Sequence, residues 1–138
     1  MRILLVQQSE DLGAIWCRFL KRHGVAADFA GTQQKALAAL EASDYDALVI
    51  DPVLDGCGGG LPVADFATFR NPDIVILAVT GSSFFSEGSI FDLIPNARGV
   101  MHTPMRPDDL LAYLEHFHAR HAPRDAEAEA ARAKTGNV

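Results

Sequence analysis

The 138-residue chain has a hydrophobic share of 49% and a charged share of 22%, which is typical of a folded globular protein rather than a disordered one. Its 18 acidic and 12 basic residues give a formal net charge of -6, which disfavours nonspecific binding to nucleic acid or to an anionic membrane. No apolar stretch is long enough to span a membrane, and the run after Arg2 is too short for a signal-peptide core. We therefore expect a cytoplasmic location, with no direct nucleic-acid or membrane partner.

The first half of the chain alternates apolar runs with helical patterns. Strands are predicted at residues 2–6, 25–30 and 47–50. The first helix begins after Ser9, a good N-cap, and its predicted buried face is formed by Leu12, Ile15, Trp16, Phe19 and Leu20. Thr32 can cap a second helix, whose composition favours that structure.

The second half continues the alternation. A weaker helical pattern covers residues 63–69, and a strongly apolar strand follows at residues 74–79. Gly88 and Pro95 argue against a long helix in the next segment. A fifth strand at residues 98–102 and a last helix from Asp108 complete the pattern. We expect one domain over residues 1–122 and a charged, alanine-rich tail over residues 123–138, helical or frayed.

Five strands that alternate with helices predict an α/β fold in which a parallel sheet carries helices on both faces. The carboxyl ends of parallel strands share one edge, and ligands of open α/β sheets bind there. The residues that this topology brings to the edge are Gln7, Gln8, Asp51, Thr80 and Thr103.

Two of these edge residues could carry chemistry. Asp51 directly follows a buried strand, where a carboxylate can be a nucleophile or a metal ligand, or can simply cap the loop. Thr80 and Gly81 could hold an anionic oxygen or only end a strand. The glycines at positions 58–60 lack the lysine of a phosphate-binding loop and predict a flexible turn.

The other reactive side chains form no recognisable catalytic set. His116, His118 and His121 crowd the last helix without a supporting constellation of cysteines or carboxylates, which favours a solvated helix end over a metal site. Cys17 fits a core position, and Cys57 lies among glycines, where exposure would make it reactive. We therefore expect a protein that is not an enzyme.

The order of elements and edge residues resembles the receiver domain of two-component response regulators over residues 1–120. That resemblance implies a flavodoxin-like five-stranded sheet in the order 2-1-3-4-5. It makes Asp51 the phospho-acceptor and Thr80 the switch hydroxyl. Gly59 falls at the usual glycine after the acceptor loop, and Pro104 at the proline of the Lys-Pro pair.

The departures from the family pattern fall on its chemistry. Gln7 and Gln8 stand where the resemblance places two acids, which with Asp51 and the main-chain carbonyl of Val53 would hold Mg²⁺. Neutral amides add no negative charge, so the site is expected to be vestigial and Mg²⁺ binding weak or absent. Glu10 could lend a replacement carboxylate, although a helix cap is its more ordinary role.

Further substitutions lie beside this site. Thr103 replaces the lysine that contacts the phosphoryl group, and Val100 replaces the switch aromatic residue. Asp55 takes the place of a frequent proline and could also lend a carboxylate, although a turn acid is its commoner role. With the acidic pair and the lysine both replaced, ordinary acyl-phosphate chemistry is expected to be impaired.

Three functions compete. The leading hypothesis is a stand-alone degenerate receiver that binds a histidine kinase, a phosphotransfer protein or another regulator, or forms a homodimer through residues 83–120. In that region Phe84 and Phe85 fit either a contact face or the interior. The first alternative keeps Asp51 as a phospho-acceptor with atypical metal dependence, and the second is a small-ligand binder at the same sheet edge.

Overall fold

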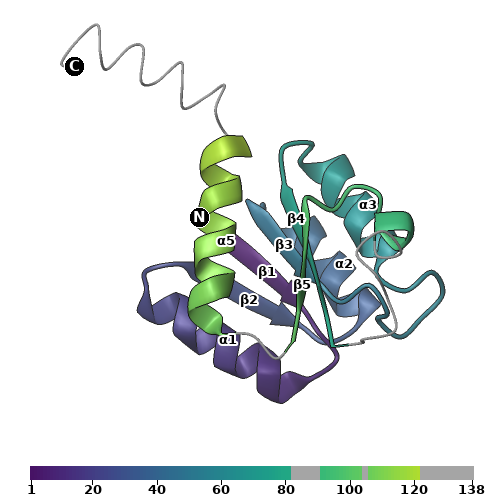
Figure 1. Ribbon diagram of the computed structural model, residues 1–138. Helices are drawn as coiled ribbons and strands as arrows, with labels where there is room; N and C mark the ends of the chain where they lie inside the picture. Colours follow the sequence, from purple (N-terminus) through teal and green to yellow (C-terminus); the bar gives the residue numbers. More distant parts are fainter. Residues whose placement is uncertain (82–90, 104–105, 122–138) are drawn as a thin grey trace, which may run out of the picture.

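A computed structural model describes residues 1–81, 91–103 and 106–121, the last four of these by their backbone only. The five strands are β1 (Arg2–Val6), β2 (Ala26–Ala30), β3 (Ala47–Ile50), β4 (Val75–Thr80) and β5 (Gly99–His102). The helices are α1 (Glu10–Arg22), α2 (Gln33–Ala42), α3 (Leu61–Arg70) and α5 (Pro107–His121). The strands form one parallel sheet in the order β2-β1-β3-β4-β5, which confirms the predicted fold class (Figure 1).

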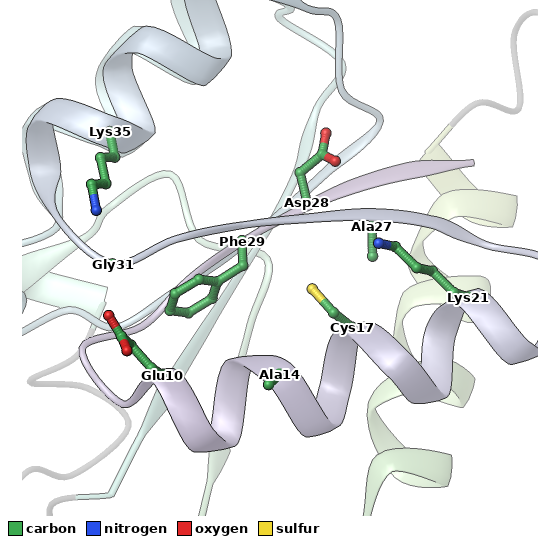
Figure 2. A pocket seen from close by; sticks show the side chains of 9 residues that line it. All are labelled: Glu10, Ala14, Cys17, Lys21, Ala27, Asp28, Phe29, Gly31 and Lys35. Atoms are coloured by element: carbon green, nitrogen blue, oxygen red, sulfur yellow. The ribbon is translucent and has the colours of Figure 1, made fainter.

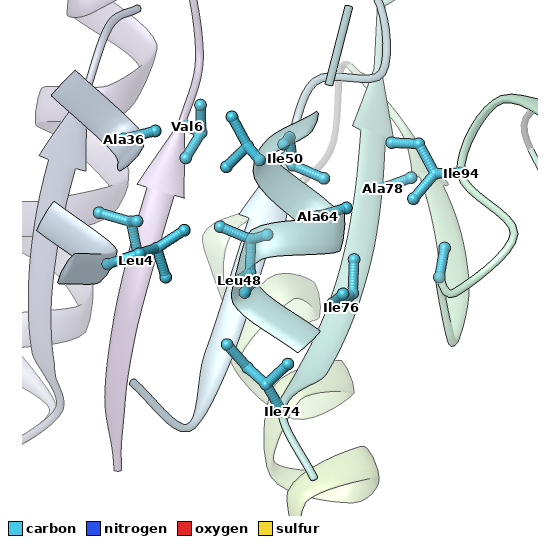
Figure 3. Packing of buried hydrophobic residues seen from close by; sticks show 14 of the residues in the cluster. Leu4, Val6, Ala36, Leu48, Ile50, Ala64, Ile74, Ile76, Ala78 and Ile94 are labelled. Atoms are coloured by element: carbon cyan, nitrogen blue, oxygen red, sulfur yellow. The ribbon is translucent and has the colours of Figure 1, made fainter. Parts of the chain in front are cut away.

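Each face of the sheet is covered by a separate pair of helices. Helices α1 and α5 pack over one face, where Trp16 and Leu114 meet the strands, and α2 and α3 cover the other (Figure 1). Figure 3 shows the second layer, in which Leu4, Leu48 and Ile76 from successive strands lie under α2 and α3. Because alternate strand residues point to opposite faces, the continuous apolar runs of β1 and β3 supply both layers at once.

The helix caps follow the sequence closely. The Ser9 hydroxyl accepts a hydrogen bond from the backbone N–H of Leu12 at 3.2 Å, and the Thr32 hydroxyl accepts one from Lys35 at 3.1 Å. Each bond satisfies a helix N–H that would otherwise lack a partner. Helix α1 ends at Arg22 with His23 as its C-cap, and Gly24 follows with a φ of +78°, the left-handed conformation that glycine adopts readily.

Two apolar side chains do not lie where helical periodicity suggests. Ile15, predicted on the buried face of α1, is 52% exposed, whereas Trp16 and Leu20 are fully buried and Leu12 and Phe19 pack partly buried against the same core. Phe69, near the end of the α3 pattern, is 80% exposed. Within the described ranges no helix is long and apolar enough to cross a membrane.

Candidate functional site

The site lies at the carboxyl edge of the sheet, where loops leave neighbouring strands. Backbone hydrogen bonds extend the strand pairing by one residue there: Asp51 N–H donates to Val6 C=O at 3.0 Å, and Thr103 N–H donates to Thr80 C=O at 2.9 Å. The first bond places Asp51 beside the strand that ends before Gln7. The sheet therefore brings together the described edge residues that the sequence predicted.

Asp51 is a half-buried carboxylate whose first oxygen is already oriented. Its Oδ1 accepts a hydrogen bond from the backbone N–H of Val53 at 2.9 Å, which folds the start of the loop into a turn. Burial raises the pKa of Asp51, the bond from Val53 partly offsets that rise, and the negative charge of Asp55 adds to it. Asp51 is thus held at the sheet edge, half-buried, with one oxygen fixed by the backbone of Val53.

The side chain of Gln8 places a hydrogen-bond donor against the main-chain carbonyl of Val53. Its side chain is exposed, and its Nε2 donates to the main-chain oxygen of Val53 at 2.9 Å. This geometry identifies the contacting atom as the amide nitrogen, since two facing oxygens would repel one another. The carbonyl that the receiver resemblance assigns to a cation is therefore occupied by an N–H of the same chain.

Gln7 is buried, with 5% of its surface exposed, and its Nε2 lacks a hydrogen-bond partner in the part of the chain that is described. A buried amide without a partner costs free energy, and such atoms are uncommon. Gln7 therefore brings a neutral donor, not a negative charge, to the interior of the site.

These donor atoms do not fit Mg²⁺. That ion prefers oxygen ligands, including one or two carboxylates, in near-ideal octahedral geometry. Here Asp51 is the carboxylate at the predicted position, Gln8 turns its nitrogen toward the shared carbonyl, and Gln7 adds no charge. The described residues contain no group of three or more histidine, cysteine or acidic side chains that could hold a metal ion.

The two replacement carboxylates considered from the sequence are both exposed. Glu10 begins α1, in the first turn after the Ser9 cap, which is the role that its position favours. Asp55 lies in the turn after β3, and its charge raises the pKa of Asp51. It therefore makes a negative charge on Asp51 less favourable.

A residue that sequence reasoning missed supports the acceptor loop. Gln33, the first residue of α2, donates through Nε2 to the main-chain oxygens of Cys57, at 3.1 Å, and Gly59. Gln8 and Gln33 thus both hold the loop after β3 through their side-chain amides. Nothing in the sequence pointed to this role of Gln33, because a glutamine is an ordinary residue in a helical run.

Gly59 is required by both its backbone conformation and its surroundings. Its φ is +61°, and a Cβ there would lie 2.5 Å from the Pro52 carbonyl oxygen. This agrees with the glycine position that the resemblance implies. Gly24 has a similar φ of +78° but nothing within 4 Å of its Cβ position.

These two glycines give a matched test. We expect Gly59→Ala to lower the free energy of unfolding by about 2–3 kcal/mol, because strain and a backbone clash add. Gly24→Ala should cost about 1 kcal/mol, because only the φ penalty applies. Urea unfolding of both variants measures the difference, and equal losses would refute the close packing assigned to Gly59.

The remaining predicted positions lie on β4 and β5. Thr80 is buried at the end of β4. Thr103 lies close by, since a Cβ on Gly81 would be 2.9 Å from its hydroxyl oxygen. Val100 is 8% exposed and belongs to the α2–α3 side of the core. Pro104 lies outside the described residues.

A separate groove of about 490 Å³ lies between α1 and β2, away from Asp51 (Figure 2). Cys17 and Phe29 line it together with the charged side chains of Lys21 and Lys35. Burial raises the pKa of the Cys17 thiol, which keeps it in the unreactive protonated form. Cys57, in contrast, is exposed.

The pKa of Asp51 makes a prediction for stability. Because the pKa is raised in the fold, ionising Asp51 disfavours folding, and the stability of the protein falls as pH rises through that pKa. Asp51→Asn keeps an acceptor for Val53 without a charge. We expect it to be more stable than wild type at neutral pH, by up to about 1 kcal/mol given partial exposure.

The advantage of Asp51→Asn should disappear below the ordinary range of carboxyl pKa values. Urea unfolding of both proteins, from neutral pH down to below the carboxyl pKa range, measures how this stability difference changes. A variant that is less stable than wild type at neutral pH, with the gap closing in acid, would reverse the sign that burial predicts.

Comparison with solved structures identifies the fold as that of response regulator receiver domains. A CheY-like receiver domain from Methanospirillum hungatei has a TM-score of 0.79 and 24% identity, covering 89% of this chain and 97% of that one. NtrX from Brucella abortus has a TM-score of 0.81 and 19% identity over 94% of this chain and 29% of its own. A response regulator from Burkholderia pseudomallei, solved with a phosphorylated aspartic acid and calcium, has a TM-score of 0.73 at 22% identity, over 99% of this chain and 75% of that one.

The sequence comparison is weaker. The transcriptional regulatory protein TcrA of Mycobacterium tuberculosis is 36% identical over 59 residues, which are 43% of this chain and 23% of TcrA. The match thus spans less than a quarter of that relative. No family model matches the chain. The receiver fold is therefore established by structure, at identities that leave the chemistry to be argued from the residues of this chain.

Proposed function

We propose that this chain is a receiver domain of two-component signalling that acts mainly through protein–protein interaction, with impaired Mg²⁺-dependent phosphorylation. The observation that carries the proposal is the hydrogen bond from Gln8 Nε2 to the Val53 carbonyl. That bond occupies one of the two lone pairs of the oxygen, and it sets the positively polarised N–H of Gln8 where a family carboxylate would face the cation. Gln7 and Gln8 add no charge that would compensate for the loss.

The same substitutions favour the metal-free state. Clustered carboxylates repel one another in an empty site, whereas two amides beside Asp51 remove that repulsion. The amides of Gln8 and Gln33 hold the acceptor loop at three carbonyls without any ion. Output would then depend on the abundance or availability of a partner.

The partners proposed are a histidine kinase, a phosphotransfer protein, another regulator or a second copy of the chain. For the described part of the 83–120 face, a groove of about 490 Å³ supports contact of this kind. Met101 of β5 and Tyr113 and His116 of α5 line it, and Tyr113 is exposed. Phe84 and Phe85, which were also assigned to this face, lie outside the described residues.

Substitution of Gln8 by glutamate directly tests the role of the hydrogen bond from Gln8 to the Val53 carbonyl. Glutamate has the same length but cannot donate to Val53, and it adds charge beside Asp51. We expect Gln8→Glu to lower the free energy of unfolding by about 1 kcal/mol without Mg²⁺, and to regain part of it with Mg²⁺. Wild type should be indifferent to the ion in the same urea titrations.

The exposed Gln34 on α2 provides the control, since Gln34→Glu makes the same change away from the site. It should respond to Mg²⁺ no more than wild type does. If wild type itself were stabilised by Mg²⁺, and Asp51→Ala removed the effect, the proposal of a metal-independent site would be wrong.

Phosphorylation of Asp51 with atypical metal dependence is a second candidate. It is favoured by the half-buried carboxylate of Asp51, which lies at the sheet edge with its Oδ1 held by the backbone N–H of Val53. A small-ligand function gains less support. The groove between α1 and β2 is lined by none of Gln7, Asp51 and Thr80.

A further inference from the structure

The outer face of α3 carries aromatic surface that the core does not use. Phe69 is 80% exposed, and its ring stacks on Phe66 with a centroid distance of 6.3 Å and an interplanar angle of 22°. Phe66 is half-buried and packs against the core. Because the pair is anchored from below, Phe69 presents a rigid apolar surface to solvent.

This surface is one wall of a groove of about 510 Å³. Four α3 residues at positions i, i+4, i+7 and i+8 line it and therefore lie along one stripe of the helix. They are Leu61, Asp65, Thr68 and Phe69. Pro95 and Asn96 form the opposite wall. The groove thus follows two turns of α3.

The two walls are fixed to one another. Asn96 Nδ2 donates to the main-chain oxygen of Ala64 at 3.1 Å and to the Thr68 hydroxyl at 2.7 Å. The Thr68 hydroxyl in turn donates to the Ala64 oxygen at 3.1 Å. Because the groove is formed in advance, the protein itself loses little conformational entropy when a ligand binds.

The groove belongs to the α2–α3 side of the sheet, opposite α1 and α5 (Figure 1). It is thus distinct from the groove between β5 and α5. Phe91 and Leu93, in the segment that leads to Pro95, are also exposed. Neighbouring exposed apolar side chains of this kind mark interaction surfaces more often than isolated ones do.

The charges of this region select the occupant. Asp65 lines the groove, and Asp92 is exposed in the segment before it. Arg70, in the last turn of α3, forms an ion pair with Asp44, with 3.5 Å between a guanidinium nitrogen and Oδ1. A second copy that used the same face would bring acid against acid, and the chain has a net charge of -6.

We propose that the groove between α3 and residues 95–96 binds an amphipathic helix of another protein, with an apolar stripe on Phe69 and a basic residue opposite Asp65. Helices bind grooves in this way through apolar side chains at i, i+3 and i+4 spacing. Aromatic residues at the centre of such a contact carry much of its affinity.

Two synthetic helical peptides test the proposal. Both carry the same leucine stripe, flanked by lysine in one and by glutamate in the other, and each is titrated into the full-length chain labelled with ¹⁵N. The lysine peptide should shift the amide signals of Leu61, Thr68, Phe69 and Asn96, and the glutamate peptide should bind at least about tenfold more weakly.

Three variants localise the binding. Phe69→Ala should weaken the lysine peptide at least about tenfold, and Asp65→Asn severalfold. Ile15→Ala removes an exposed apolar side chain from α1, on the other side of the sheet, and should change nothing. All three positions are solvent-accessible, so the variants should fold, as urea unfolding can verify.

Other outcomes would overturn the proposal. Shifts that map to another face, or affinity unchanged by Phe69→Ala and Asp65→Asn, would show that the peptide recognises net charge alone. Self-association of the free chain that Phe69→Ala abolishes would assign the groove to a second copy instead. Neither result depends on the proposed impairment of phosphorylation.

Discussion

Replacing Gln7 and Gln8 together by aspartate should give the chain a much stronger Mg²⁺ site than wild type has. The double variant would offer three carboxylates, with Asp51, around the Val53 carbonyl that Gln8 otherwise occupies. Charge and oxygen ligands are what the site needs for a hard divalent cation. Calorimetric titration should show Mg²⁺ affinity at least about tenfold above that of wild type.

The same variant should be unstable without the ion. Three neighbouring carboxylates repel one another, so we expect the free energy of unfolding to fall by about 1–3 kcal/mol and to recover when Mg²⁺ is added. Adding Asp51→Ala to the double variant is the control and should remove most of the new affinity. If Mg²⁺ bound wild type and the double variant equally well, the assignment of these positions would be wrong.

The second large effect concerns phosphorylation. Adding Thr103→Lys to the double variant restores a cation at the sheet edge, where Thr103 is held beside Thr80 by a backbone hydrogen bond. Cationic groups neutralise the charge of a phosphoryl group in transfer. In Mg²⁺, the triple variant should be phosphorylated by a small phosphodonor at least about 100-fold faster than wild type.

Thr103→Lys alone is the matched control for that experiment. It supplies the cation but leaves the two amides in place, so its gain should be much smaller than that of the triple variant. Phosphate incorporation over time, measured with Asp51→Ala as background, separates the two. Equal rates for both variants would show that Gln7 and Gln8 are not what limits the chemistry.

The fold followed from the sequence because its determinants are local. The apolar runs of β1 and β3, the Ser9 and Thr32 caps and the glycine after α1 each act within a few residues. Parallel pairing then brings Gln7 and Asp51 to one edge without further information. The predicted edge could therefore be derived before any coordinates were known.

The details that decide the chemistry are long-range. The bond from Gln8 to Val53 joins residues 45 apart in sequence, and that from Gln33 to Gly59 joins residues 26 apart. Periodicity likewise places Ile15 and Phe69 on helices, but it does not determine how much of each helix surface the neighbouring elements bury. Only packing against neighbouring elements determines that both side chains are exposed.

Impaired Mg²⁺-dependent phosphorylation of Asp51 is tested most directly by the intact mass of the chain after incubation with a small phosphodonor, with and without Mg²⁺. Wild type and Asp51→Ala are compared, because only the first can carry a phosphate on Asp51. With Mg²⁺ present, we expect wild type to carry little or no phosphoryl adduct beyond that of Asp51→Ala. A stable adduct on wild type that requires both Mg²⁺ and Asp51 would contradict it.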